Sequence, residues 1–213
     1  MRQIFKYRFK LMLIIFTFNY VAVTNAVADE IISSGKNLVQ KHCSECHGVQ
    51  GNVTEHTHGK IPNIAGFSSI LIYDTLYQFK EGDRQATLIK NNKEKLIDMK
   101  QISNFLSEEE TEAIALYLSE QTFIPAKQPY DTALVSTGKQ LHQDLCNDCH
   151  GDNGKSAVDD APILAGQWKP YLIDQFDQIS KRQRYIPKRM KRKFRKLNDD
   201  DKKALIAFYT SSQ

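Results

Sequence analysis

Two short clusters of cysteine and histidine hold the residues best suited to chemistry in this sequence. Residues 43–47 and 146–150 share the pattern C-x-x-C-H, and together they contain all four cysteines of the chain. Two thiols at this spacing can bond to the two vinyl groups of one haem, and the adjacent histidine then reaches the iron, so the pattern is typical of c-type haem attachment. The sequence therefore predicts two covalently attached haem c groups. The expected thioether residues are Cys43, Cys46, Cys146 and Cys149, and the expected proximal iron ligands are His47 and His150.

Three other kinds of site also use cysteines in pairs. Four cysteines in an exported protein are compatible with two disulfides. A thioredoxin-type redox motif needs a βαβ context, and the sequence shows none. Zinc sites built from two C-x-x-C units usually separate the units by about 15–20 residues, whereas Cys46 and Cys146 are 100 residues apart. The repetition of the whole C-x-x-C-H unit favours the two haems.

The methionines predict the second axial ligand of each iron. Beyond residue 28 the chain has two, Met99 and Met190, one in each half and each seven residues before a leucine. Histidine and methionine together form the axial pair of electron-transfer haems, and the thioether raises the reduction potential. A lone methionine is usually core filler, but two in equivalent positions favour iron ligation. His56 and His58 are alternative ligands in the first half, where we expect a surface loop instead.

Prolines and glycines near these motifs have predicted structural roles. Pro62 and Pro162 are expected to present a backbone carbonyl to the second nitrogen of each proximal histidine, because ligating imidazoles need such a partner. A simple turn proline is the alternative. Gly35 and Gly138 are expected to allow a close crossing between the first and last helices of each half. An ordinary glycine near a helix start is the other interpretation.

The landmarks recur because the sequence contains an internal duplication. The C-x-x-C-H units, the P-x-[IL]-A-G segments at residues 62–66 and 162–166, and the two methionines follow in the same order in both halves. We predict two domains, residues 29–120 and 137–213. Between them, residues 121–136 contain two prolines and are expected to form an extended linker.

Helical signals dominate both predicted domains. Ser107 and Glu110 fit a capping box in the first, and Asn198 fits an N-cap in the second, each followed by apolar residues at three- to four-residue spacing. No stretch shows sustained strand alternation, so we predict an all-α fold. Domains of this size bury a limited fraction of their surface, and a covalently held haem would enlarge each core.

The first 28 residues are expected to be an export signal. Four basic residues precede the apolar run from Leu11 to Val23, and Ala26-Val27-Ala28 fits a cleavage site. The run of 13 residues is short for a membrane span, which needs roughly 17–25, although an uncleaved anchor is the alternative. The mature protein would begin near Asp29 and reside in the periplasm.

Charge is balanced overall and uneven locally. Beyond residue 28 the chain has 25 basic and 25 acidic residues, which does not favour nucleic-acid binding. Residues 29–128 have 10 bases and 14 acids and residues 129–213 have 15 and 11, so the two halves are expected to attract one another. Residues 181–196 contain ten bases and no acid, and they bracket Met190. This run is either a solvated loop or a docking surface for an acidic electron partner.

A family resemblance accompanies these motifs. Each half resembles a class I cytochrome c domain, and the mature chain resembles the dihaem cytochrome c4 group. Residues 125–134, 164–172 and 207–209 are similar to the cytochrome subunit of flavocytochrome c sulfide dehydrogenase. That similarity implies a haem subunit that receives electrons from an FAD-containing, sulfide-oxidising flavoprotein and passes them to a soluble or membrane acceptor. The sequence departs from the pattern in the basic run and in the long Pro62–Met99 interval.

Two other functions remain open. The first is a free cytochrome c4-like shuttle between a quinol-oxidising complex and a terminal oxidase. The second is a peroxidase with one open haem, which is less favoured because both halves supply a methionine. The sequence shows no catalytic base or nucleophile, so we expect an electron carrier that is not an enzyme by itself.

Overall fold

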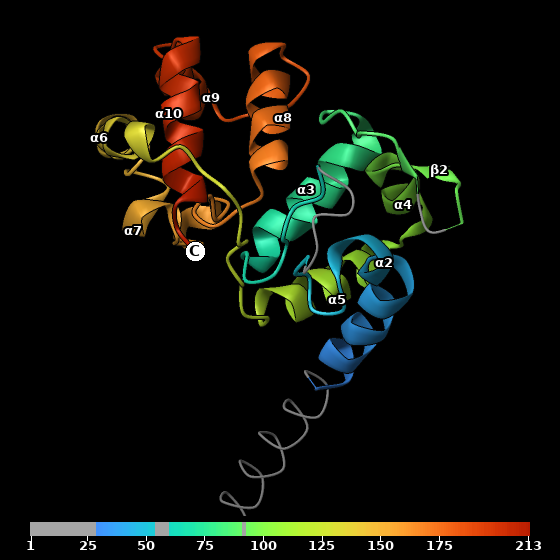
Figure 1. The fold of residues 1–213 in the computed structure, drawn as a ribbon. Helices are drawn as coiled ribbons and strands as arrows, with labels where there is room; N and C mark the ends of the chain where they lie inside the picture. Colours follow the sequence, from blue (N-terminus) through green and yellow to red (C-terminus); the bar gives the residue numbers. More distant parts are fainter. Residues whose placement is uncertain (1–28, 54–59, 91–92) are drawn as a thin grey trace, which may run out of the picture.

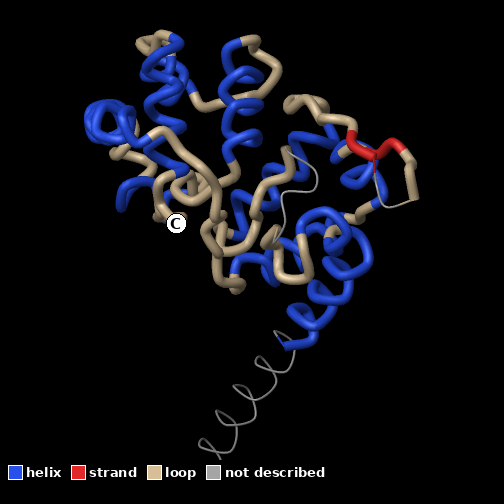
Figure 2. Tube along the Cα trace, viewed as in Figure 1, coloured by secondary structure: helices blue, strands red, loops and turns tan. Residues whose placement is uncertain are grey.

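The computed structural model describes residues 29–53, 60–90 and 93–213. The predicted export signal and the alternative ligands His56 and His58 lie outside these residues. The described chain forms two helical domains with short connecting loops, which confirms the predicted fold class (Figures 1 and 2). None of the helices in the described ranges is long and apolar enough to cross a membrane.

The first domain packs its helices around one apolar core. A helix over residues 29–42 leads into the short α2 (Ser44–His47), followed by α3 (Ser69–Glu81), α4 (Met99–Phe105) and α5 (Glu108–Ser119). Helix α3 packs against both α4 and α5. The core includes Val39 from the first helix and Ile114 and Leu118 from α5, all at most 1% exposed.

The second domain repeats this arrangement. It contains η1 (Thr132–Leu134), α6 (Val135–Leu145), the single turn α7 (Gly151–Gly154), η2 (Val158–Asp160), α8 (Lys169–Ser180), α9 (Lys188–Phe194) and α10 (Asp199–Thr210). Figure 1 shows α6 against α10, and these two helices are in extensive contact. Leu172, Leu205 and Tyr209 form the centre of its core. Helix α6 begins inside the segment expected to be linker.

Local signals act as the sequence predicts. The Ser107 hydroxyl accepts from the Glu110 backbone N–H at 3.2 Å, and the Glu110 carboxylate accepts from the Ser107 N–H at 2.9 Å. Asn198 and Asp201 form the same reciprocal box at the start of α10. These caps satisfy backbone N–H groups that a helix N-terminus leaves unpaired.

Glycine allows the first and last helices of each domain to touch. A Cβ atom built on Gly35 would lie 2.0 Å from the Ala113 carbonyl oxygen, and one on Gly138 would lie 2.0 Å from that of Ala204. No side chain larger than hydrogen fits at such distances. The predicted helix crossing is therefore confirmed in both domains.

One element was not predicted. The two-residue strands β1 (Ile89–Lys90) and β2 (Leu96–Ile97) form an antiparallel hairpin just before α4. The hairpin lies within the first domain's longer interval between proline and methionine. Strands this short show no alternation pattern in sequence.

The two domains meet through equivalent turns. Residues 83–85 and 183–185 pair in antiparallel fashion: the Gln85 N–H donates to the Gln183 carbonyl, and the Tyr185 N–H donates to that of Asp83, both at 2.8 Å. These turns follow α3 and α8, so the pairing joins the same position of both repeats.

Attraction between the net charges of the two halves stays a prediction, because the contacts at this interface do not follow those net charges. The ion pair found across it in the described residues joins Lys60 to Asp174 at 2.6 Å, a base from the acidic half and an acid from the basic half. Two arginines, Arg84 and Arg184, meet at the same boundary. Backbone pairing, side-chain hydrogen bonds, this ion pair and the packing of Ile163 into the first domain's core all contribute to the contact between the domains.

Candidate haem sites and the interface between them

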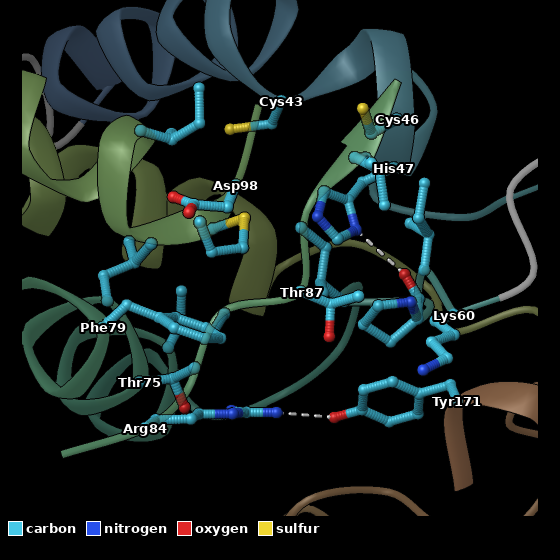
Figure 3. Close-up of a pocket in the computed structure, with 18 of the residues that line it drawn as sticks. Cys43, Cys46, His47, Lys60, Thr75, Phe79, Arg84, Thr87, Asp98 and Tyr171 are labelled. Carbon is cyan, nitrogen blue, oxygen red and sulfur yellow. Dashed lines mark hydrogen bonds between the residues drawn. The ribbon is translucent and has the colours of Figure 1, made fainter. Parts of the chain in front are cut away.

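The first C-x-x-C-H unit opens onto a deep apolar cavity. Cys43, Cys46 and His47 line it from the start of α2 (Figure 3). Met99, the first residue of α4, also lines it. Apolar side chains of α3 and α5, including Phe79 and Leu118, complete the walls. The structure thus brings the predicted residues of the first site around one space.

Each proximal histidine is oriented by the proline predicted to do so. Nδ1 of His47 lies 2.9 Å from the Pro62 carbonyl oxygen, and Nδ1 of His150 lies 3.1 Å from that of Pro162. Because a carbonyl oxygen can only accept a hydrogen bond, Nδ1 carries the proton in both rings. Nε2 therefore keeps its lone pair, the arrangement that metal-ligating histidine requires.

Burial keeps both imidazoles uncharged. It lowers the pKa of His47, with the Pro62 carbonyl partly opposing the shift. It lowers the pKa of His150 to about 4, again against the proline carbonyl. At neutral pH both rings are thus neutral and able to bind a metal.

The sulfurs of Cys43 and Cys146 lie where a neutral form is favoured. Burial raises the pKa of the Cys43 thiol to about 12, and the nearby Cys46 adds to this effect. Burial also raises the pKa of Cys146. A thioether is neutral at every pH, so these positions suit covalent attachment better than a role as thiolate.

The two methionines occupy helix starts. Met99 follows the N-cap Asp98, whose carboxylate accepts from the Gln101 N–H at 2.8 Å and fixes the beginning of α4. Met190 is the third residue of α9 and is half-buried. Iron ligation by either methionine stays a prediction.

Two arginines at the domain boundary have a role that the sequence did not predict. Arg84 is 5% exposed and donates to the Tyr171 hydroxyl at 3.0 Å and to the Gln175 side chain at 2.8 Å. Arg184 donates to the same Gln175 oxygen at 2.8 Å. The sequence contained a sign of their equivalence, because Arg84 and Arg184 are 100 positions apart, as Pro62 and Pro162 are.

This cluster contains buried donors without hydrogen-bond partners in the part of the chain that the structure describes, on residues that line the cavity. The Nε atoms of Arg84 and Arg184 are buried and have no hydrogen-bond partner among the described residues, and both arginines line the cavity. Burial and the charge of Arg84 lower the pKa of Arg184 to about 10, so Arg184 remains a cation at neutral pH. Although burial raises the pKa of Tyr171, the two positive charges outweigh it and lower that pKa overall.

Haem fits these observations. Buried guanidinium groups with free N–H donors call for carboxylates, and haem carries two propionates. The apolar walls, the two cysteines and the neutral histidine suit the macrocycle, its vinyl groups and its iron. At the first site Cys43 and Cys46 would hold the group covalently, and His47 would bind the iron from one side.

Comparison with known proteins agrees with this geometry. Residues 32–122 match the family described as "Cytochrome c", and residues 133–208 match the family described as "Cytochrome C oxidase, cbb3-type, subunit III". Cytochrome c4 of Stutzerimonas stutzeri is 26% identical over 171 residues, which cover 76% of this chain and 77% of that protein.

Two further relatives extend the comparison. Subunit CcoP of the Cbb3-type cytochrome c oxidase of Helicobacter pylori is 26% identical over 149 residues, and the chain spans only 46% of its length. The crystal structure of reduced recombinant cytochrome c4 from Pseudomonas stutzeri superposes with a TM-score of 0.67 at 25% identity. It covers 85% of this chain and 98% of that one.

Fold and site together define a protein of two tandem cytochrome c domains that carries two covalently bound haem c groups. More specifically, the chain is similar over most of its length to dihaem cytochromes of the cytochrome c4 type.

Proposed function

We propose that this protein is an exported shuttle that accepts electrons from one redox protein and delivers them to another. The contact between the two domains is the observation that best supports this function. Arg84 and Arg184 come from equivalent turns, share the acceptor Gln175 and line one cavity. Each haem, when bound, supplies reversible one-electron chemistry at its iron. The chain itself orients the imidazoles, excludes water and joins the two sites in one structure.

Location in the periplasm is part of this proposal. The predicted export signal at residues 1–28 and the two haem-attachment motifs support it. Cell fractionation followed by N-terminal sequencing tests it. A mature protein that begins near Asp29 in the periplasmic fraction is expected, and a cytoplasmic or uncleaved protein would contradict it.

Reoxidation of the reduced holoprotein tests the shuttle function. Chemically reduced protein is mixed with membranes of the native host, and the loss of the reduced haem band is followed by stopped-flow absorbance. We expect fast reoxidation of two electron equivalents per chain, blocked by an inhibitor of the terminal oxidase. Reoxidation no faster than in buffer would reject the function.

A second candidate is the haem subunit of a sulfide-oxidising flavoprotein complex. It is favoured by the similarity of residues 125–134 and 164–172 to that subunit. In the structure these segments bind each other: the Ala126 N–H donates to the Gly166 carbonyl at 2.8 Å, and the Gln128 side chain donates to that of Gln167 at 2.7 Å. The contact between the linker and the second domain is enough to explain why these segments are similar. We therefore place the shuttle first.

Purification of the tagged holoprotein from the native host separates the two candidates. A stoichiometric FAD-containing subunit that remains bound through gel filtration would support the flavoprotein complex. Elution as the free cytochrome, together with fast reoxidation by membranes, supports the shuttle.

A further inference from the structure

The two haem sites differ behind the first cysteine of each motif. In the second domain His142 precedes Cys146 by four residues and is fully buried. Its Nδ1 lies 3.1 Å from the hydroxyl oxygen of Tyr209, which is 1% exposed. Burial of two polar groups this deep inside a small apolar core needs an explanation, because each loses its hydration.

The first domain has apolar residues at the equivalent positions. Val39 precedes Cys43 by four residues and is fully buried. Gly35 contacts Tyr117 as Gly138 contacts Phe208, so the next residue along, Leu118, corresponds to Tyr209. The first domain therefore has Val39 and Leu118 at the positions where the second domain has the hydrogen-bonded pair His142–Tyr209.

This polar pair lies directly against the haem attachment residues. The backbone carbonyl of His142 accepts from the Cys146 N–H at 2.8 Å. The hydroxyl of Tyr209 interacts with the Cys146 sulfur, which raises the pKa of Tyr209 beyond the effect of burial. In the holoprotein that sulfur belongs to a thioether, which competes only weakly for the Tyr209 proton.

The surroundings of the imidazole indicate which way the hydrogen bond runs. Burial lowers the pKa of His142, and the Asn147 side chain and the His150 carbonyl partly oppose this shift. Nε2 makes no hydrogen bond within the described residues. Because the His150 carbonyl interacts with the ring and can only accept, and because Nδ1 faces Tyr209, we place the ring proton on Nε2. Nδ1 then accepts from the Tyr209 O–H, and the hydroxyl oxygen, the negative end of that dipole, is the atom near Cys146.

We propose that the His142–Tyr209 pair lowers the reduction potential of the second haem and so makes the two sites of one chain electrically different. The pair stabilises the ferric form, which has one more positive charge than the ferrous form, through the hydroxyl lone pairs and the polarisable ring. Val39 and Leu118 offer the first haem no such stabilisation. Polarity and hydrogen bonding around a haem are established determinants of its potential. The inference rests on the two haems alone and requires no particular electron partner.

Spectroelectrochemical titration of the holoprotein tests the proposal. A double variant, His142→Val with Tyr209→Leu, has the first domain's residues at these two positions. One of the two haem reduction potentials should then rise. The reverse exchange, Val39→His with Leu118→Tyr, should lower the other potential, which assigns each component to its domain. The linker variant Tyr130→Phe also loses a hydroxyl, far from either pair in sequence, and should leave both potentials unchanged.

Tyr209→Phe removes the hydroxyl and keeps the ring, and this variant tests the proposal if the double variant of His142 and Tyr209 does not retain the second haem. A positive shift of the second potential, with two haems still bound, supports the proposal. An unchanged or lowered potential overturns it. A purely structural pair would show itself differently, through a lower unfolding temperature of the holoprotein with both potentials intact.

Discussion

Asn63 and Gln167 form a reciprocal pair across the domain boundary. The Asn63 backbone N–H donates to the Gln167 side-chain oxygen at 3.0 Å, and the Gln167 amide donates back to the Asn63 carbonyl at 2.7 Å. They are 1% and 0% exposed. The equivalent positions in the other repeat are Phe67 and Ile163, which both belong to the first domain's apolar core. Asn63 and Gln167 are thus polar residues at the interface, whereas Ile163 and Phe67, at the equivalent positions of the other repeat, are apolar.

Gln167→Ala should therefore destabilise the holoprotein. It leaves the buried N–H and carbonyl of Asn63 without partners, and each such group costs about 1–3 kcal/mol. We expect the free energy of unfolding to fall by at least about 2 kcal/mol, measured by guanidinium titration with far-UV circular dichroism. Gln143→Ala is the matched control, because its bond to Asn153 is exposed, and it should cost no more than about 0.5 kcal/mol. Equal losses in the two variants would contradict this account.

The sequence allowed prediction of features that depend on neighbouring residues. The capping boxes at Ser107 and Asn198 act within one helical turn. The close approach at Gly35 and Gly138 follows from a repeated glycine at a fixed distance from the cysteines. Each of these has a physical cause within a few residues or within the repeat, and each was found in the structure.

Features that depend on how the domains pack were not predictable in the same way. Asn63 and Gln167 interact over 104 positions, and neither has a partner suggested by its own repeat. Arg184 belongs to the basic run that was expected to be either a solvated loop or a docking surface, yet its Nε is buried at the interface. The basic composition of residues 181–196 predicted an exposed side chain, whereas the pairing of residues 83–85 with 183–185 places Arg184 at the domain interface.

Loss of the second cysteine pair should remove one haem. The holoprotein with Cys146→Ala and Cys149→Ala is expected to carry a single haem that survives denaturation and acid extraction, as measured by intact mass. Its second domain should lose much of its helix signal, because the haem supplies part of that core. The reciprocal variant, Cys43→Ala with Cys46→Ala, should also keep one haem. Two haems in either variant would refute covalent attachment at these residues.

Met99→Ala and Met190→Ala should each open one iron to external ligands. Loss of the thioether lowers the potential of that haem, and added imidazole or cyanide should then bind to half of the haem. Optical titration and spectroelectrochemistry measure both effects. Leu96→Ala is a suitable control, because Leu96 is an exposed hairpin residue 61% accessible to solvent. Wild-type behaviour of Met99→Ala would instead make His56 or His58 the ligand to test.

The basic run near Met190 presents most of its charge to solvent. Arg184 points inward, Lys181 pairs with Asp177, and Arg189 and Lys193 lie 3.6 and 3.7 Å from Asp148. The remaining bases are exposed and have no ion pair among the described residues. We call these residues the basic surface: Arg182, Lys188, Lys191, Arg192, Arg195 and Lys196.

Reversal of Lys191, Arg192 and Arg195 to Glu should slow electron exchange with an acidic partner and leave both haem spectra intact. Charge steering raises association rates by about 10- to 1000-fold. It weakens with salt, because the Debye length falls from about 10 Å at 0.1 M to about 3 Å at 1 M. We therefore expect the second-order rate from stopped-flow to fall at least about tenfold at low salt and to converge with the wild-type rate at high salt. The same charge change at three other exposed lysines, Lys139, Lys155 and Lys169, should have a much smaller effect. If both triple variants slow transfer equally, overall charge is responsible and the basic surface is not a docking site.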